Sequence, residues 1–124
     1  KEFERLVGKW TDDYHKLEML KDFSVKNNCV VVLKGAYTAI SYQGKIWFNS
    51  SGNAALATAG SGDVLTGIIT SLLAQGYSSV EASLMGVFIH GRTADIGIES
   101  DESTESFIAS DAISCLAEAF KELG

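Results

Sequence analysis

The stretch "NAALATAGSGDVLTGIITSLLAQG", residues 53–76, decides how this sequence is interpreted. Small residues, glycines and one acid precede a strongly apolar run that begins at Val64. Apolar residues then recur at helical spacing, and Gln75-Gly76 is typical of a helix end. The apolar positions are 64, 65, 68, 69, 72 and 73. We therefore predict a loop that enters a helix, with Gly60-Ser61-Gly62-Asp63 at the junction.

This junction has two interpretations. The first turn of a helix exposes unpaired N–H groups at the positive end of the helix dipole, so residues 60–62 could form an anion hole. Asp63 could then orient or deprotonate a hydroxyl placed beside a bound phosphate. The alternative is an ordinary helix cap, in which Ser61 or Asp63 bonds the first N–H groups. The segment matches neither the P-loop nor the dinucleotide-binding glycine pattern, so spacing alone leaves both open.

The residues before this stretch predict helices and strands in alternation. Residues 12–27 have the pattern of an amphipathic helix capped by Thr11. The run "CVVVL", residues 29–33, is short and β-branched, which predicts a strand buried on both faces of a parallel sheet. Residues 37–42 and 45–49 are separated by Gln43-Gly44 and predict a hairpin. The fold class is therefore α/β.

Two further helices are predicted after residue 76. Ser78 and Glu81 form a capping-box pattern for a helix that extends to about Ile98. Small residues would let it pack closely on its neighbours: Ala82, Ser83, Gly86, Gly91 and Ala94. The acidic stretch 99–106 predicts a surface loop. Ser110 is then expected to cap a final helix with an inward face of Ile113, Leu116, Ala117 and Phe120.

Lys34 and Gly35 stand at the carboxyl end of the strand predicted over 29–33. In open α/β sheets ligands bind outside such strand ends, so Lys34 could meet a nucleotide phosphate and Gly35 could allow its close approach. The alternative is a solvated lysine before a turn. His90 is expected to be a hydrogen-bonded core residue rather than a catalytic group or a metal ligand.

Composition excludes some classes of partner. A net charge of −6 over 124 residues argues against a general nucleic-acid binder or a binder of anionic membranes. No apolar run approaches the roughly 20 residues of a membrane span. Cys29 and Cys115 have no metal-binding spacing and predict a buried, reduced pair in a cytoplasmic protein.

Three segments in this order resemble a known family: "VVLKGAYTAI" at 31–40, "GNAALATAGSGDVLTGIITSLLAQG" at 52–76 and "HGRTADI" at 90–96. The chain resembles the ADP/ATP-dependent NAD(P)H-hydrate dehydratases of the ribokinase-like superfamily. The resemblance implies a three-layer α/β/α sandwich, of which residues 1–124 would be the C-terminal part of a single domain. The remaining N-terminal part of the domain would belong to the same protein or be a separate polypeptide.

The resemblance also implies an activity. Family members repair NADH and NADPH that have become hydrated at C6 of the nicotinamide ring. The C6 hydroxyl is activated with a phosphoryl group from ADP or ATP and leaves as phosphate. Mg²⁺ is implied by the phosphate chemistry, although the sequence shows no metal ligand set. A cytoplasmic homo-oligomer is expected.

Site residues follow from the matching motifs. Asp63 corresponds to the catalytic base, which also contacts the hydrated substrate, and Gly60, Ser61 and Gly62 correspond to the anion hole. Contacts to the adenine nucleotide are implied for Lys34, Gly35, Ala36, Tyr37, Thr38 and Gly62. The chain departs from the family pattern at Ala59, where a second glycine is common, and at Ala54-Ala55, where the family has Pro-Gly.

Two other functions remain open at this stage. The same Gly-Ser-Gly-Asp would serve a ribokinase-like kinase that phosphorylates a small molecule such as a vitamin precursor. The chain could also be a nucleotide-binding fragment without catalysis.

Overall fold

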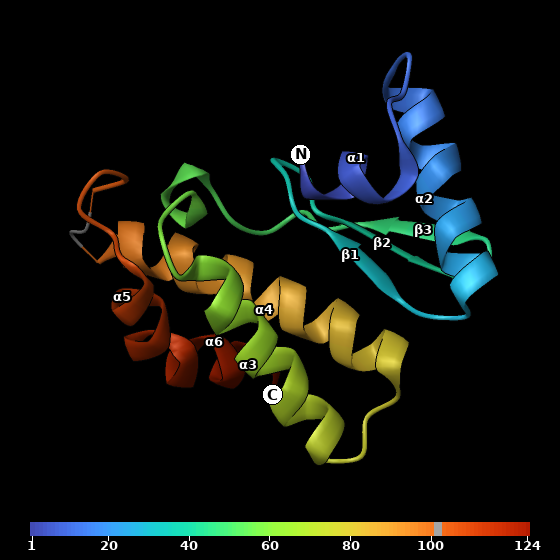
Figure 1. Cartoon of the computed structure of the whole chain (residues 1–124). Helices are drawn as coiled ribbons and strands as arrows, with labels where there is room; N and C mark the ends of the chain where they lie inside the picture. The colour runs from blue at the N-terminus through green and yellow to red at the C-terminus, as the bar shows by residue number, and fades with distance from the viewer. Residues whose placement is uncertain (101–102) are drawn as a thin grey trace. The chain divides into compact units, whose positions relative to one another are not determined.

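The computed structural model describes residues 1–100 and 103–124 and divides the chain into two units, Lys1–Phe48 and Asn49–Gly124 (Figure 1). Each unit is described below by itself. The acidic loop predicted over 99–106 includes Asp101 and Glu102, which lie outside the described residues. That residues 1–124 belong to a single domain stays a prediction.

The first unit is a small antiparallel sheet with two helices. The helices are α1 (Glu2–Val7) and α2 (Asp13–Asn27), and the strands are β1 (Val31–Leu33), β2 (Ala39–Tyr42) and β3 (Lys45–Phe48). The described strands pair in the order β1-β2-β3, and α2 packs on β2. Leu20 of α2 is fully buried together with Phe3 of α1 and Ala39 of β2. Burial of a leucine side chain contributes about 1.5–3 kcal/mol to the stability of the folded state, so Leu20 helps to hold α2 against the sheet.

The predicted hairpin is confirmed. β2 and β3 pair antiparallel, with Tyr42 opposite Lys45. The two residues between the strands, Gln43 and Gly44, both have positive φ, at 51° and 79°. That conformation matches the right-handed twist of the flanking strands, and glycine adopts it readily.

Two details of this unit differ from the sequence prediction. β1 begins at Val31, is half-buried and pairs antiparallel with β2, so the prediction of a parallel strand buried on both faces is wrong. An apolar run indicates burial, but only its partner strand decides direction. The N-cap of α2 is Asp12 rather than Thr11, because Asp12 Oδ1 accepts a hydrogen bond from the His15 N–H at 2.8 Å.

The second unit is helical. It contains the short 3₁₀ helix η1 (Ala54–Leu56), then α3 (Ser61–Ala74), α4 (Ser79–Glu99), α5 (Ala109–Ser114) and α6 (Leu116–Leu123). α4 contacts η1 and the other three helices, and Figure 1 shows α3 and α6 lying along it. The predicted capping box of α4 is confirmed, with Ser78 and Glu81 bonding each other's backbone N–H groups.

Small residues let α4 pack closely on its neighbours, as predicted. A Cβ added to Gly86 would lie 2.6 Å from Ile69 Cγ1 of α3. A Cβ added to Gly97 would lie 2.5 Å from the ring of Phe107. Both contacts are much shorter than van der Waals distance, so a larger residue would push the elements apart.

The predicted final helix is interrupted. α5 ends at Ser114 and α6 begins at Leu116, and α5 starts after Ile108, whose N–H donates to Asp111 Oδ2 at 2.8 Å. Ser110 is therefore not the cap. Ala112 and Ala119 are buried, whereas Ile113 and Phe120 are 57% and 40% exposed and Ala117 is exposed as well, so the predicted inward face is wrong at these three positions. The break at Cys115 changes which residues of the apolar pattern face the core.

Two predictions about the whole chain can be compared with the described residues. Cys29 and Cys115 belong to different units and are both half-buried, so the prediction that both are buried is wrong. None of the described helices is both long and apolar enough to span a membrane.

Candidate functional site

The first turn of α3 presents backbone N–H groups without intramolecular acceptors. The Ser61 N–H donates to the Thr58 carbonyl at 3.2 Å, and the Val64 N–H donates to the Gly60 carbonyl at 3.1 Å. Within the described chain, the N–H groups of Gly62 and Asp63 between them have no such partner, and no side chain caps this helix. Unsatisfied N–H groups at a helix N-terminus can bind anions, so Gly62 and Asp63 are the candidate donors. Ser61, which was predicted to form the anion hole with Gly60 and Gly62, already donates its N–H to Thr58 and is not a free donor.

Gly60 gives this turn its shape. Its φ of 84° is in the left-handed region, where a residue with a side chain is strained. A Cβ at this position would also lie 3.2 Å from the Cβ of Ala109, the first residue of α5. A glycine is therefore required at residue 60 for the loop to enter α3 in this direction.

Asp63 is exposed and stands in the first turn of α3. It lines a pocket of about 470 Å³ between α3 and the α5–α6 segment. The other lining residues are predominantly apolar: Val64, Gly67, Ile68, Ser71, Ile113, Leu116 and Phe120. The arrangement places a carboxylate beside free N–H donors and an apolar surface, which suits a ligand with both a phosphate and an uncharged ring.

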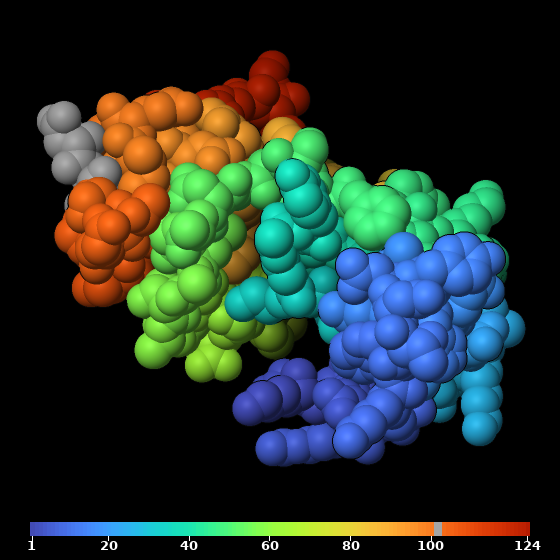
Figure 2. Space-filling view, turned by 90° about the horizontal axis from the view of Figure 1, so that it is seen from above, coloured from blue at the N-terminus to red at the C-terminus, as the bar shows by residue number. Residues whose placement is uncertain are grey.

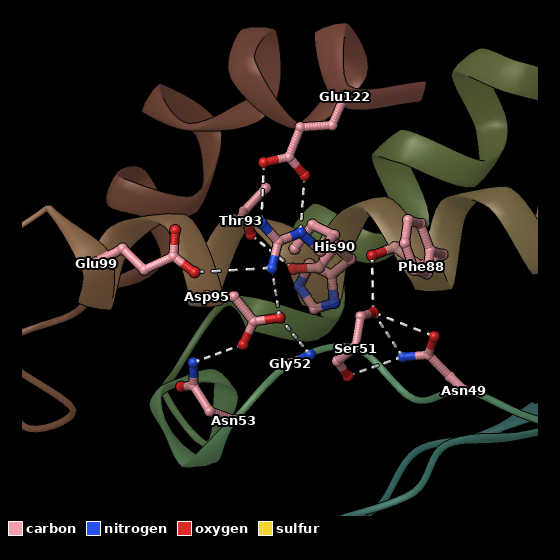
Figure 3. A network of polar contacts seen from close by, with 11 residues as sticks. Asn49, Ser51, Gly52, Asn53, Phe88, His90, Thr93, Asp95, Glu99 and Glu122 are labelled. Atoms are coloured by element: carbon pink, nitrogen blue, oxygen red, sulfur yellow. Dashed lines mark hydrogen bonds and ion pairs between the residues drawn. The ribbon is translucent and has the colours of Figure 1, made fainter. Parts of the chain in front are cut away.

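The loop that leads to this turn is held by Asp95 of α4. Asp95 Oδ2 accepts from the Gly52 N–H at 3.0 Å, and Asp95 Oδ1 accepts from Asn53 Nδ2 at 3.0 Å. Asn53 Oδ1 in turn accepts from the Ala55 N–H at 2.9 Å and starts η1. Figure 3 shows the Asp95 carboxylate between Gly52 and Asn53. One carboxylate thereby fixes both the backbone and the side chain of this loop.

Ser51 and Gly91 bring the same loop against α4. Ser51 Oγ donates to the Phe88 carbonyl at 2.8 Å (Figure 3). A Cβ added to Gly91 would lie 2.7 Å from the Ser51 carbonyl carbon, so glycine is needed for this approach. The loop and the helix are in direct backbone contact here.

Arg92 connects Asp95 to α6. Its Nη1 lies 3.3 Å from Asp95 Oδ2, while its Nε and Nη2 donate to the two carboxylate oxygens of Glu122 at 2.8 and 2.9 Å. These hydrogen bonds lower the pKa of Glu122 and raise that of Arg92. Bidentate guanidinium–carboxylate pairs are stronger and more directional than other surface ion pairs.

Ser61 is joined to His90 of α4. Ser61 Oγ lies 3.2 Å from His90 Nε2, and the two residues are only 2% and 3% exposed. His90 is a buried, hydrogen-bonded residue, as the sequence predicted.

The segment predicted to contact the nucleotide lies in the first unit. Residues 34–38 connect β1 to β2, and Lys34, Gly35, Ala36 and Tyr37 are exposed. Thr38 is half-buried, and its Oγ1 donates to the Gly35 carbonyl at 3.5 Å. Figure 2 shows this segment at the molecular surface. The structure therefore brings together Gly60, Ser61, Gly62 and Asp63 in the second unit, while residues 34–38 belong to the other unit.

The sequence pattern predicts no cluster of metal-binding side chains, and the described residues can be compared with that expectation. In the part of the chain that the structure describes, no three or more His, Cys, Asp or Glu side chains gather where they could hold an ion. Mg²⁺ at such a site would be held largely by the nucleotide phosphates and water, and no step below depends on it.

Comparison with protein families shows the family to which this chain belongs. A family model described as NAD(P)H-hydrate dehydratase matches residues 1–116. The chain belongs to the NAD(P)H-hydrate dehydratase family. Among curated relatives, the bifunctional NAD(P)H-hydrate repair enzyme of Thermofilum pendens is 43% identical over 101 residues, which are 79% of this chain and 19% of that enzyme.

Solved structures agree with this membership. The ADP/ATP-dependent NAD(P)H-hydrate dehydratase from Bacillus subtilis, co-crystallised with ATP/Mg²⁺, matches with a TM-score of 0.90 and 31% identity. The match covers 99% of this chain and 45% of that one. A ribokinase-like superfamily protein of Enterococcus faecalis matches with a TM-score of 0.77 and 25% identity, over 97% of this chain and 41% of that one. The predicted ribokinase-like α/β fold is confirmed.

The chain spans less than half the length of these relatives. It corresponds to the C-terminal part of the dehydratase domain, as predicted.

Sequence reasoning did not assign a role to the residues that hold the site. Arg92 and Asp95 lie within the segment "HGRTADI", which resembles the dehydratase family, but the sequence predicts no role for them or for Glu122. The local feature that could have drawn attention to them is a pair of charged residues, Arg92 and Asp95, in a mostly apolar part of the predicted helix. Their partners, Gly52 and Glu122, are about 40 and 30 positions away, so no local pattern could identify them.

Proposed function

We propose that this chain is the nucleotide-processing part of an ADP-dependent dehydratase that acts on hydrated NADH and NADPH, with ATP as the alternative phosphoryl donor. The main support for the proposal is the geometry of the first turn of α3. There the free N–H groups of Gly62 and Asp63 adjoin an exposed carboxylate in a chain of this family. Relatives named for ADP- or ATP-dependent dehydration support the choice of co-substrates.

In the proposed reaction, the C6 hydroxyl oxygen of the hydrated nicotinamide attacks the terminal phosphorus of ADP. Asp63 accepts the hydroxyl proton, and AMP leaves as the bond to its phosphate breaks. The C6–O bond then breaks with its electron pair on the departing phosphate, and C5 loses a proton, which restores the ring double bond of NADH. The N–H groups of Gly62 and Asp63 stabilise charge on the transferred phosphoryl oxygens.

The nucleotide is proposed to contact Lys34, Gly35, Ala36, Tyr37 and Thr38 in addition to Gly62. The exposed position of Lys34 to Tyr37 supports this role, since these residues are accessible to a ligand. An ammonium group near the phosphates would compensate their charge in a protein of net charge −6.

The test is NADH regeneration from its hydrate with ADP or ATP, using the complete protein. Asp63→Asn should lower kcat by about 10²–10⁴-fold, which is the usual contribution of a general base. Asp22→Asn, at an exposed position of α2, is a matched control that should retain activity. Full activity of Asp63→Asn would remove Asp63 from the reaction, and a stable phosphorylated product without NADH would identify a kinase instead.

We further infer a cytoplasmic homo-oligomer. The location is inferred because nicotinamide and adenine nucleotides are substrates of the cell interior, and the homo-oligomer is inferred only from the resemblance to the dehydratase family. Light scattering on the complete protein would measure its oligomeric state, and cell fractionation would locate it.

A further inference from the structure

His90 and Ser61 form a buried polar contact between the candidate site and α4. Ser61 stands immediately before Gly62 and Asp63, whose N–H groups are the proposed phosphate donors. Its own N–H is occupied by the Thr58 carbonyl, so Ser61 contributes its side chain to the turn rather than a donor to the anion. That side chain points inward, with Oγ 3.2 Å from His90 Nε2.

The position of His90 is fixed by its own surroundings. The His90 carbonyl accepts from Thr93 Oγ1 at 2.6 Å, and the next residue, Gly91, is in backbone contact with Ser51. Figure 3 shows His90 on the stretch of α4 that includes Asp95 and that contacts Ser51 of the loop. The imidazole therefore stands on a turn of α4 that contacts both the loop before η1 and the start of α3.

His90 is only 3% exposed, so its polar ring is removed from water. Burying a polar ring and a hydroxyl is unfavourable unless they are hydrogen-bonded, and a hydrogen bond between two buried groups favours one arrangement of their neighbours. The bond forms in either neutral tautomer, because a hydroxyl both donates and accepts. The geometry thus favours a role in orientation over one in proton transfer.

We propose that His90 is a positioning residue for the anion hole. By holding Ser61 Oγ it sets the first turn of α3, so that the N–H groups of Gly62 and Asp63 point at the transferred phosphoryl group. The inference rests on the proposed function. Misplacement of reacting groups by about 1 Å lowers rates by about 10²-fold, so a loosened turn affects turnover more than substrate binding.

The test compares Ser61→Ala, His90→Leu and the double variant in the complete protein. Each single variant should lower kcat with ADP by about tenfold to hundredfold and change KM for the hydrated substrate by less than about threefold. The double variant should be no worse than the poorer single variant, because both remove the same contact. His90→Gln, which retains a donor and acceptor at similar reach, should recover much of the activity.

A second readout is the preference for ADP over AMP, measured as the ratio of their dissociation constants. AMP lacks the terminal phosphate, so a misaligned anion hole lowers this ratio in Ser61→Ala and in His90→Leu. Ser83→Ala is the matched control: Ser83 is also a buried serine hydroxyl, bonded within α4 to the Ser79 carbonyl at 2.7 Å. It should leave both kcat and the ratio unchanged.

Several outcomes separate this inference from the proposed function. Folded Ser61→Ala with wild-type kcat and an unchanged ratio would overturn the role of His90, as would losses that multiply in the double variant. If His90→Leu fails to fold, Ser61→Ala and His90→Gln decide the question. A wild-type protein that binds ADP without forming NADH would refute the proposed dehydratase activity. The ratio of the dissociation constants for ADP and AMP in the variants would then be the measurement that tests the role of His90.

Discussion

Arg92 on α4 and Glu122 on α6 are joined by two parallel hydrogen bonds of 2.8 and 2.9 Å. Through Nη1, the same guanidinium reaches Asp95, which holds the loop at Gly52 and Asn53. A chain of charged contacts therefore runs from the C-terminal helix to the loop that leads to the candidate site.

Glu122 should make the stability of the protein depend on pH. Its pKa is lowered from 4.5 chiefly by the hydrogen bond from Arg92, so the folded state favours the ionised carboxylate. The contribution is present above about pH 4.5 and is lost as the pH falls through the lowered folded value. In denaturant unfolding, Glu122→Gln should be less stable than wild type at pH 7 and equal to it in acid. Glu118→Gln, at another exposed position of α6, should show no such difference, and a gap that persists in acid would contradict this prediction.

Asp95→Ala should destabilise the loop before η1. The substitution removes the acceptor for the Gly52 N–H and for Asn53 Nδ2 and leaves Arg92 with Glu122 and Glu99. Hydrogen bonds to charged groups contribute about 1.5–3 kcal/mol, so we expect a loss of about that size in the free energy of unfolding. Hydrogen exchange of the Gly52 amide should accelerate as well. Wild-type protection of this amide in Asp95→Ala would contradict the assignment.

Gly91→Ala should be strongly destabilising. The new Cβ would meet the Ser51 backbone at 2.7 Å, where neither the loop nor α4 can yield without a shift. Overpacking of this kind costs about 1–3 kcal/mol, measured as a lower free energy of unfolding. Gly67→Ala is the matched control, because a Cβ there meets nothing within 4 Å and alanine favours a helix over glycine by about 1 kcal/mol. Opposite signs for the two variants are the expected result.

Lys34→Ala should weaken nucleotide binding without affecting the fold. Lys34 is exposed and follows β1, so its removal leaves the core intact. A charge-assisted hydrogen bond to phosphate contributes about 1.5–3 kcal/mol, which corresponds to a rise of about tenfold or more in KM for ADP. Lys45→Ala, an exposed lysine of β3, controls for the change in net charge. Equal KM values for the two variants would argue against a nucleotide contact at Lys34.

Local patterns predicted most elements of this fold. The hairpin at Gln43-Gly44, the start of α4 at Ser78 and the start of α3 at Gly60 are each decided by residues within one turn of one another. Predictions were wrong where the structure depends on residues that are far apart in the sequence. The direction of β1 depends on β2, and the exposure of Ile113 and Phe120 depends on the break between α5 and α6.

For the candidate site, too, some features follow from local sequence and others only from tertiary structure. The sequence alone indicated residues 60–63 as a candidate site, because the start of any helix leaves its first N–H groups without intrahelical partners, and the role of Asp63 stays a prediction. Only the tertiary structure revealed that Asp95 holds Gly52, that Arg92 reaches Glu122 and that His90 meets Ser61. These partners lie 29 to 43 positions apart, and their contacts form only when the packing of α4 brings them within hydrogen-bond distance.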